Sequence, residues 1–360
     1  MLVAWKTRRL EVKSLHSEVA SAPTKNKVIS VALQGGGSHG AFTWGVLDRL
    51  LEDQRISLEG ISGASAGALN AVVLASGFVS GGRTGAREAL KAFWESVSTR
   101  EPFTLTQASL QANSSSSQLT VIKAFLFWCR FYSPYQLNPF NLNPLREILS
   151  RQIDFERLRA ECKLSLFVAA TAVETGMPRL FRNSELTLDV LLASSCLPQM
   201  HHSVQIEGTA YWDGGLTANP PIRPLLYKCA ADDILVVLLN PFRRPRTPAT
   251  ADAIFERMTE ISFTSAFYAE LQGIAMAKQE AEDGRFSFGS LERRLKRLKM
   301  HLIDSKDLMI ELAPLSKLDT HASFIRALYE EGRTSAHAWL ESNYHSIGVR
   351  SSFELTDHLY

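Results

Sequence analysis

Two glycine-rich turns, each placed directly after a stretch of apolar and β-branched residues, constrain the fold of this chain more than any other feature. The first turn, GGGSHG at 35–40, follows VISVALQ, and the second, GASAG at 63–67, follows SLEGIS. Each turn leads into a segment with the spacing of a helix, AFTWGVLDRLLED after the first and ALNAVVLASG after the second. A repeated strand–turn–helix pattern predicts an α/β fold in which the strands are parallel and buried.

Two further apolar stretches predict additional buried strands later in the chain. They are LSLFVAATAV at 164–173 and DILVVLLNP at 233–241, and DVLLASSCLP between them predicts a short helix that ends at its proline. A single long amphipathic helix is expected over 250–283, and the chain beyond it has a mostly helical pattern. We therefore expect a flexible tail over 1–26, a main α/β domain over 27–245 and a mostly helical extension over 246–360 that packs on the core.

Composition and charge narrow the classes of partner. The 360 residues include 39 Lys and Arg against 37 Asp and Glu, a net charge of +2, which gives no electrostatic basis for binding nucleic acid. The four cysteines are far apart and form no CxxC pair, so neither a disulfide framework nor a zinc site is expected. The N-terminal segment lacks the apolar core of a secretory signal, and no apolar run is long enough to span a membrane. We therefore expect a cytoplasmic protein.

The first glycine turn is open to two interpretations. Gly35, Gly37 and Gly40 match the G-x-G-x-x-G fingerprint of dinucleotide-binding folds, but such folds also need an acidic residue at the end of the second strand. Here the second strand ends in G-x-S-x-G, the nucleophile elbow, which presents Ser65 at the tip of a sharp strand-to-helix turn. The amides of Gly36 and Gly37, one strand away, would then stabilise the oxyanion of a tetrahedral intermediate. We prefer this oxyanion hole, with a nucleotide-binding module as the alternative.

The base that a serine nucleophile needs is less clearly marked. None of the nine histidines lies in a motif with an acid partner, and His201 and His202 are expected to line the site or the surface rather than to act as the base. Asp213 in TAYWDGG follows a short β-like stretch, and the two glycines after it would let its carboxylate reach a neighbouring strand end. An Asp-Gly hairpin turn explains the same residues. The residues alone therefore leave Asp213 open between a catalytic and a structural role.

The three motifs GGGSHG, GASAG and DGG, in this order and spacing, resemble the patatin-like phospholipase family. The resemblance extends to ASSCLP, because the family commonly has a similar block before its aspartate. It covers roughly 27–241 and leaves the N-terminal tail and the helical C-terminal third outside. What the resemblance implies is a three-layer α/β/α fold with a mostly parallel central sheet and a Ser–Asp dyad that uses no catalytic histidine.

Carried over motif by motif, the resemblance also assigns roles to individual residues. It implies Ser65 as the nucleophile, Asp213 as the base, and Gly35, Gly36 and Gly37 as the oxyanion hole. The chain departs from the family at His39, where many members have Arg or Lys. The role of that cation, in positioning substrate or orienting the loop, is therefore left open for this chain.

The activity that the resemblance implies is hydrolysis of lipid esters, with a phospholipid or lysophospholipid as the first choice of substrate and no metal or organic cofactor. A soluble carboxylesterase or thioesterase is the alternative within ester hydrolysis. An aspartate with an ordinary pKa near 4 is a weak base. We therefore expect apolar surroundings that raise the pKa of Asp213.

Two segments are candidates for peripheral contact with a membrane surface. The segment VIKAFLFWCRFY at 121–132 carries five aromatic residues, and LERRLKRLKMHL at 291–302 places leucines on one helical face with five Arg and Lys around them. The alternatives are a lid or an ordinary core helix for the first segment and a solvated helix or a helix-to-strand junction for the second. Oligomeric state is left open by the sequence.

Overall fold

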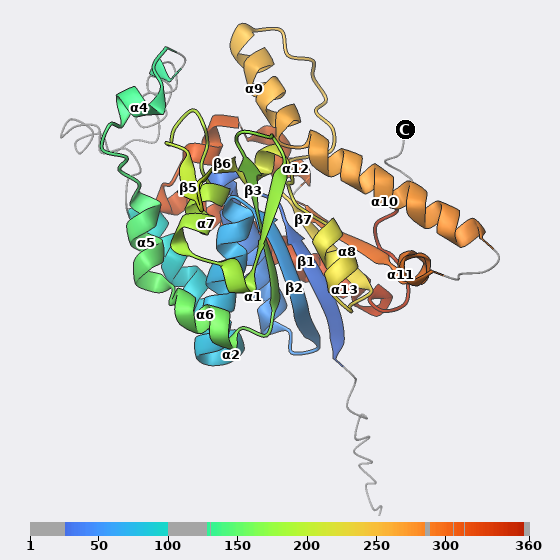
Figure 1. Cartoon of the computed structure of the whole chain (residues 1–360). Coiled ribbons are helices and arrows are strands. Elements are labelled where there is room, and N and C mark those ends of the chain that lie inside the picture. The colour runs from blue at the N-terminus through green and yellow to red at the C-terminus, as the bar shows by residue number, and fades with distance from the viewer. Residues whose placement is uncertain are drawn as a thin grey trace, which may run out of the picture.

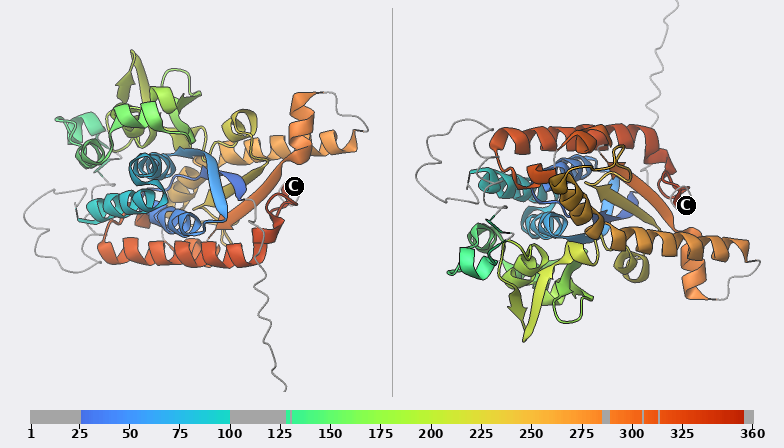
Figure 2. Two further views of the ribbon diagram at one scale, coloured as in Figure 1. Left: turned by 90° about the horizontal axis from the view of Figure 1, so that it is seen from below. Right: turned by 90° about the horizontal axis from the view of Figure 1, so that it is seen from above.

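The computed structural model of the chain describes residues 26–99, 128–129, 131–284, 289–304, 306–312 and 314–355. These residues form an eight-stranded sheet with helices packed on both faces, as the predicted α/β/α arrangement requires (Figures 1 and 2). Nearly all of the expected tail over 1–26 and most of the aromatic segment 121–132 lie outside the described residues.

Five parallel strands form most of the sheet, in the order β3, β2, β1, β7 and β8. They are β1 (Lys27–Leu33), β2 (Ile56–Ala64), β3 (Ser165–Ala172), β7 (Asp233–Leu238) and β8 (Lys299–Asp304). Three shorter strands, β4 (Pro178–Arg182), β5 (Val204–Ile206) and β6 (Thr209–Asp213), are antiparallel and lie on the β3 side. The predicted strands at 28–34, 164–173 and 233–241 are confirmed as β1, β3 and β7, and the sheet is mixed but mostly parallel.

Helices cover the two faces unequally. One face carries α1 (Gly40–Glu52), α2 (Ala66–Thr99), α5 (Pro144–Gln152), α6 (Phe155–Glu161), α7 (Leu188–Ser194) and α13 (Ala322–Asn343). The other carries α8 (Arg223–Lys228), α10 (Ser265–Asp283) and α11 (Ser290–Arg297). Shorter or more peripheral elements are α4 (Pro134–Leu137), α9 (Ala251–Ser262), α12 (Lys306–Glu311) and the 3-10 turns η1 (Gly37–His39), η3 (Asn183–Glu185), η4 (Gly214–Leu216), η5 (Pro314–Leu318) and η6 (Tyr344–Ser346). Both faces are therefore closed over an apolar core.

The chain beyond residue 245 returns to the sheet and to this core. It is mostly helical, but β8 pairs in parallel with β7. The segment 291–302 consists of α11 followed by the start of β8, with Leu295, Leu298 and Met300 buried. Because α11 ends at Arg297 and Leu295 and Leu298 are buried, the single helical face of leucines expected here is wrong, and the helix-to-strand junction is confirmed.

The single helix predicted over 250–283 is also wrong, since α9 and α10 are separate helices with a bend at Phe263 and Thr264. The hydroxyl of Thr264 donates to the carbonyl of Glu260 at 3.0 Å. The carbonyl of Phe263 accepts a hydrogen bond from Asn219 Nδ2 at 3.1 Å. A contact with a distant part of the chain therefore fixes the bend, and the local amphipathic pattern does not reveal it.

Helix α13 crosses α1 at a point where both helices carry a glycine. A Cβ atom added at Gly45 would lie 2.0 Å from the carbonyl oxygen of Tyr329, and one added at Gly332 would lie 2.0 Å from that of Phe42. Helices approach this closely only where neither has a side chain at the contact. Since α1 begins directly after the first glycine turn, α13 fixes the helix that carries this turn.

We predict that Gly45→Ala lowers the free energy of unfolding by about 1–3 kcal/mol, because the new methyl group would overlap the α13 backbone. Gly273→Ala is the matched control. It lies within α10, where an added Cβ meets nothing within 4 Å, so the free energy of unfolding should rise by about 0.5–1 kcal/mol. Urea denaturation measures both values, and a wild-type stability for Gly45→Ala would show that the helices do not touch here.

Candidate active site

Ser65 lies between β2 and α2 in a backbone conformation that only a tight turn imposes. Its φ is 52°, in the left-handed region that residues other than glycine rarely adopt. A Cβ atom at Gly63 would lie 2.5 Å from the backbone of Gly67, and one at Gly67 would lie 2.2 Å from the carbonyl oxygen of Leu33. Both glycines are therefore required, and the turn has the form expected of a nucleophile elbow.

Ser194 holds this turn in place. The amide of Ser65 donates to the Ser194 carbonyl at 3.1 Å and to the Ser194 hydroxyl at 3.0 Å. Ser194 is the last residue of α7 and is fully buried. It belongs to the ASSCLP block that forms part of the family resemblance, but the sequence gives no sign that its contact is with the nucleophile. This anchoring residue was not predicted.

Asp213 reaches the same place from β6. Ala64, just before Ser65, pairs with Ala169 of β3, and Asp213 pairs with the next residue of β3, Ala170. The two candidate catalytic residues therefore lie on opposite sides of one strand. The hydroxyl of Ser65 is among the groups that lower the pKa of Asp213, so the two side chains are close enough to interact.

The carboxylate of Asp213 is fully buried, and only one of its two oxygens has a hydrogen-bond partner among the described residues. Its Oδ1 accepts a hydrogen bond from the Gly215 amide at 2.7 Å, whereas Oδ2 has no partner among the described residues. Burial raises the pKa of Asp213 to about 7, although the Gly215 amide and the Ser65 hydroxyl lower it. The next residue must be glycine, since a Cβ at Gly214 would lie 2.1 Å from the carbonyl oxygen of Ala169. The turn therefore presents a carboxylate with one free oxygen.

The loop at Gly35 packs directly against Ser65. A Cβ atom at Gly35 would lie 2.8 Å from the Cβ of Ser65, but the Gly35 amide already donates to Asn219 Oδ1 at 2.6 Å. The predicted role of Gly35 as an oxyanion donor does not fit this contact, because its N–H group already donates to the side chain of Asn219. The amides of Gly36 and Gly37 have no acceptor in the described part of the chain.

A buried amide side chain fixes the start of this loop. Gln34 Oε1 accepts hydrogen bonds from the amides of Leu239 and Asn240 at 2.7 and 2.8 Å, and Gln34 Nε2 donates to the carbonyl of Asn219 at 3.2 Å. The loop is thus tied both to the end of β7 and to the segment that follows the DGG turn. Neither Gln34 nor Asn219 was predicted, because their partners are distant in sequence.

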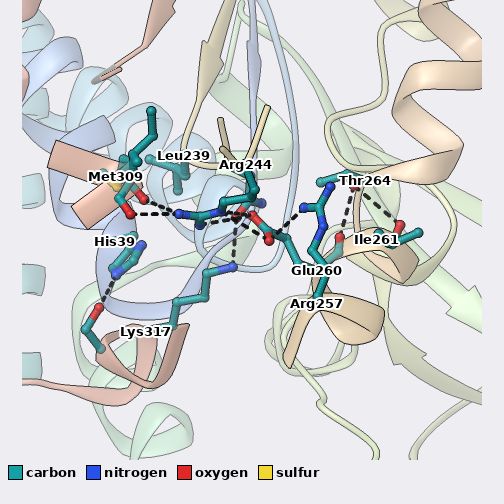
Figure 3. A network of polar contacts seen from close by, with 12 residues as sticks. His39, Leu239, Arg244, Arg257, Glu260, Ile261, Thr264, Met309 and Lys317 are labelled. Carbon is teal, nitrogen blue, oxygen red and sulfur yellow. Dashed lines mark hydrogen bonds and ion pairs between the residues drawn. The ribbon is translucent and has the colours of Figure 1, made fainter. Parts of the chain in front are cut away.

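His39 is buried and neutral, and a cation stands close by (Figure 3). Its Nε2 lies 2.8 Å from the Ser316 hydroxyl, and burial, Lys317 and Arg244 together lower the pKa of His39 to about 3. Lys317 Nζ donates to Asn240 Oδ1 at 2.8 Å, and burial lowers the pKa of Lys317 to about 8. Where many family members carry a cation on the loop, this chain therefore has a neutral His39 with a lysine supplied by η5.

The two histidines considered as bases take other positions. His202 stacks on Tyr135 with ring centroids 4.1 Å apart, and its Nε2 lies 3.2 Å from the carbonyl oxygen of Pro134. Burial lowers the pKa of His201. Both line a cavity of about 300 Å³, together with Arg146 and other polar residues. That cavity is lined by neither Ser65 nor Asp213, and no hydrogen bond joins either histidine to them.

The described residues contain neither a metal-binding cluster nor a membrane-spanning helix. No group of three His, Cys, Asp or Glu side chains is placed to hold a metal ion there. In the same part of the chain, no helix is long and apolar enough to cross a bilayer.

The chain is similar to one protein family and to solved structures. A family model described as "Patatin-like phospholipase" matches residues 31–226, which is more than half of the chain and includes Ser65 and Asp213. No curated protein matches. Among the solved structures that match is VipD from Legionella pneumophila, with 14% sequence identity, a TM-score of 0.40, and coverage of 88% of this chain and 67% of its own. On the strength of the family model, this chain belongs to the patatin-like phospholipase family.

Proposed function

We propose that the protein is a serine acyl hydrolase of lipid esters, of the phospholipase or lysophospholipase type, with Ser65 as nucleophile and Asp213 as base. The observation that carries the proposal is the pairing of a strained, partly accessible serine with a buried carboxylate whose pKa is raised to about 7. A carboxylate with that pKa is a better base at neutral pH than an ordinary aspartate. Membership of the family supports lipid esters as the substrate class.

In the first half of the proposed reaction, Ser65 Oγ attacks the ester carbonyl while Asp213 Oδ2, which has no other described partner, accepts its proton. The negative charge that forms on the carbonyl oxygen is stabilised by the amides of Gly36 and Gly37, with that of Ala66 at the start of α2 as a third donor. When the intermediate collapses, the proton passes from Asp213 to the departing alcohol, and the acyl group stays on Ser65.

The second half runs through a water molecule. Asp213, again ionised, accepts a proton from water as that water attacks the acyl carbonyl. Collapse of the second intermediate releases the fatty acid and returns the proton to Ser65 Oγ. The same carboxylate thus serves as base and acid in both halves, and Gly35 supports the loop through Asn219 without donating to the substrate.

We expect Ser65→Ala and Asp213→Asn each to lower kcat for a lipid ester by roughly 10³-fold or more, because each removes one half of the dyad. His202→Ala is the comparison variant and should keep most of the activity. Hydrolysis of a lysophospholipid and labelling of Ser65 by a fluorophosphonate measure these effects. Near-normal rates for Asp213→Asn, with activity lost in His202→Ala, would refute the dyad.

The pH profile gives a second prediction. Since only ionised Asp213 accepts a proton, kcat/KM should rise about tenfold per pH unit below the raised pKa of about 7 and reach a plateau above it. Initial rates on a substrate without ionisable groups, recorded from pH 5 to 9, test this. A profile already flat at pH 5 would mean that Asp213 keeps an ordinary pKa or is not the base.

The raised pKa of Asp213 also predicts that Asp213→Asn, which replaces the carboxyl with an uncharged amide, stabilises the folded protein at neutral pH. Below the unfolded pKa of 3.8, Asp213 is protonated in both states, so wild type and Asp213→Asn should be equally stable. As the pH rises from about 4 to 7, the unfolded carboxyl ionises while the buried one resists, so wild type loses stability relative to the variant. Above pH 7 the variant should be more stable by up to about 4 kcal/mol. Urea denaturation at pH 4 and pH 8 compares them, and equal stability at pH 8 would contradict the raised pKa.

A further inference from the structure

Helix α9 differs from the surface helices of most globular proteins in which side chains it exposes. Most surface helices bury apolar residues and expose charged ones. It exposes Ile254, Met258 and Ile261, with 44%, 61% and 48% of each residue accessible. At 100° per residue these three positions share one face of the helix. The buried member of the helix is instead the carboxylate of Glu260.

An ion pair attaches the polar face of α9 to the protein (Figure 3). Glu260 Oε1 lies 3.0 Å from Nη2 of Arg244, which precedes the helix, and within the helix Glu260 Oε2 lies 2.8 Å from Arg257 Nη1. Arg244 also donates to the carbonyl oxygens of Met309 and Ile310 at 3.0 Å. Because the charged side of the helix is used for attachment, the apolar side is held facing outward.

This helix ends beside the candidate active site. Phe263, the residue after α9, packs against Gly215, where a Cβ would lie 2.7 Å from the Phe263 ring. Its carbonyl accepts from Asn219 Nδ2 at 3.1 Å, and Asn219 Oδ1 in turn accepts from the Gly35 amide at 2.6 Å. One side chain therefore links the end of α9 to the oxyanion loop.

The charges and apolar groups around α9 are complementary to a flat, anionic surface. Arg243 and Arg246 are exposed in the loop that leads into the helix. Figure 1 shows α9 standing out from the end of the molecule at which the parallel strands terminate, and α4 projects at the same end. Phe140 and Leu142, just after α4, are 83% and 71% exposed. Two separate apolar groups at one end of a molecule are suited to an extended surface rather than to a single small partner.

We propose that α9 docks the enzyme on an anionic lipid bilayer, with Ile254, Met258 and Ile261 entering the boundary between head groups and acyl chains and Arg243 and Arg246 contacting the anionic head groups. This rests on the proposed function, since docking here would bring ester groups to Ser65. It also goes beyond that function, because it assigns the membrane contact to a helix outside the family match and to neither of the segments that the sequence suggested.

The test uses Ser65→Ala protein, so that vesicles are not hydrolysed, and two methionines as a matched pair. Met258 on α9 and Met276 on α10 are 61% and 65% exposed. Sedimentation with vesicles of phosphatidylcholine and phosphatidylglycerol should show binding that falls about tenfold or more in Met258→Asp and is unchanged in Met276→Asp. Arg243→Gln with Arg246→Gln should reduce binding to these vesicles toward the level seen with phosphatidylcholine alone.

Activity of the Ser65-containing enzymes separates this proposal from the proposed function. Met258→Asp should hydrolyse a soluble short-chain ester as wild type does but lose activity on vesicles. Equal binding by the two methionine variants, no binding of the parent protein, or a dimer that Met258→Asp dissociates would overturn the docking proposal. Vesicle binding by a protein that hydrolyses no ester would instead refute the proposed function and leave the docking intact.

Discussion

Ser65 holds a left-handed backbone between β2 and α2, and its neighbours are arranged so that it cannot relax. Such a conformation costs about 1–3 kcal/mol, which the rest of the fold must offset. Two hydrogen bonds that the Ser65 amide donates to Ser194 and two glycines without side chains keep the turn closed, and Gly35, after the neighbouring strand, packs against the serine. The position of the Ser65 hydroxyl therefore follows from this one turn.

The charged side chains near the turn are placed so that none of them lowers the pKa of Asp213. The groups that shift the pKa of Asp213 are burial, an amide and the Ser65 hydroxyl, with no cation among them. The cations Lys317 and Arg244 lie instead beside His39 and Glu260. A salt bridge at Asp213 would lower its pKa, so the distribution of charges preserves the raised pKa on which the proposed role as base depends.

The parts of the site that the sequence predicts are those that depend on local backbone geometry. Ser65 with its glycines is recognisable because only a few residue types fit a left-handed turn, and the strands before the turns have a clear apolar pattern. Asp213 needed the family resemblance, since an aspartate before glycines is also an ordinary turn. Ser194, Asn219 and Lys317 could not be predicted, because each acts through a partner more than 70 residues away in sequence. The bend between α9 and α10 was not predicted either, because the contact that fixes it comes from Asn219, 44 residues earlier in the chain.

The order of the strands has a consequence for what can fold by itself. The family match ends at residue 226, before β7, β8 and α13, yet β1 lies in the interior of the sheet with β7 hydrogen-bonded along one side. A fragment ending there would leave β1 with a bare row of amide and carbonyl groups on an apolar strand, the kind of open edge through which proteins form intermolecular sheets. A unit of this chain that folds by itself therefore needs β7, which lies beyond the residues matched by the family model.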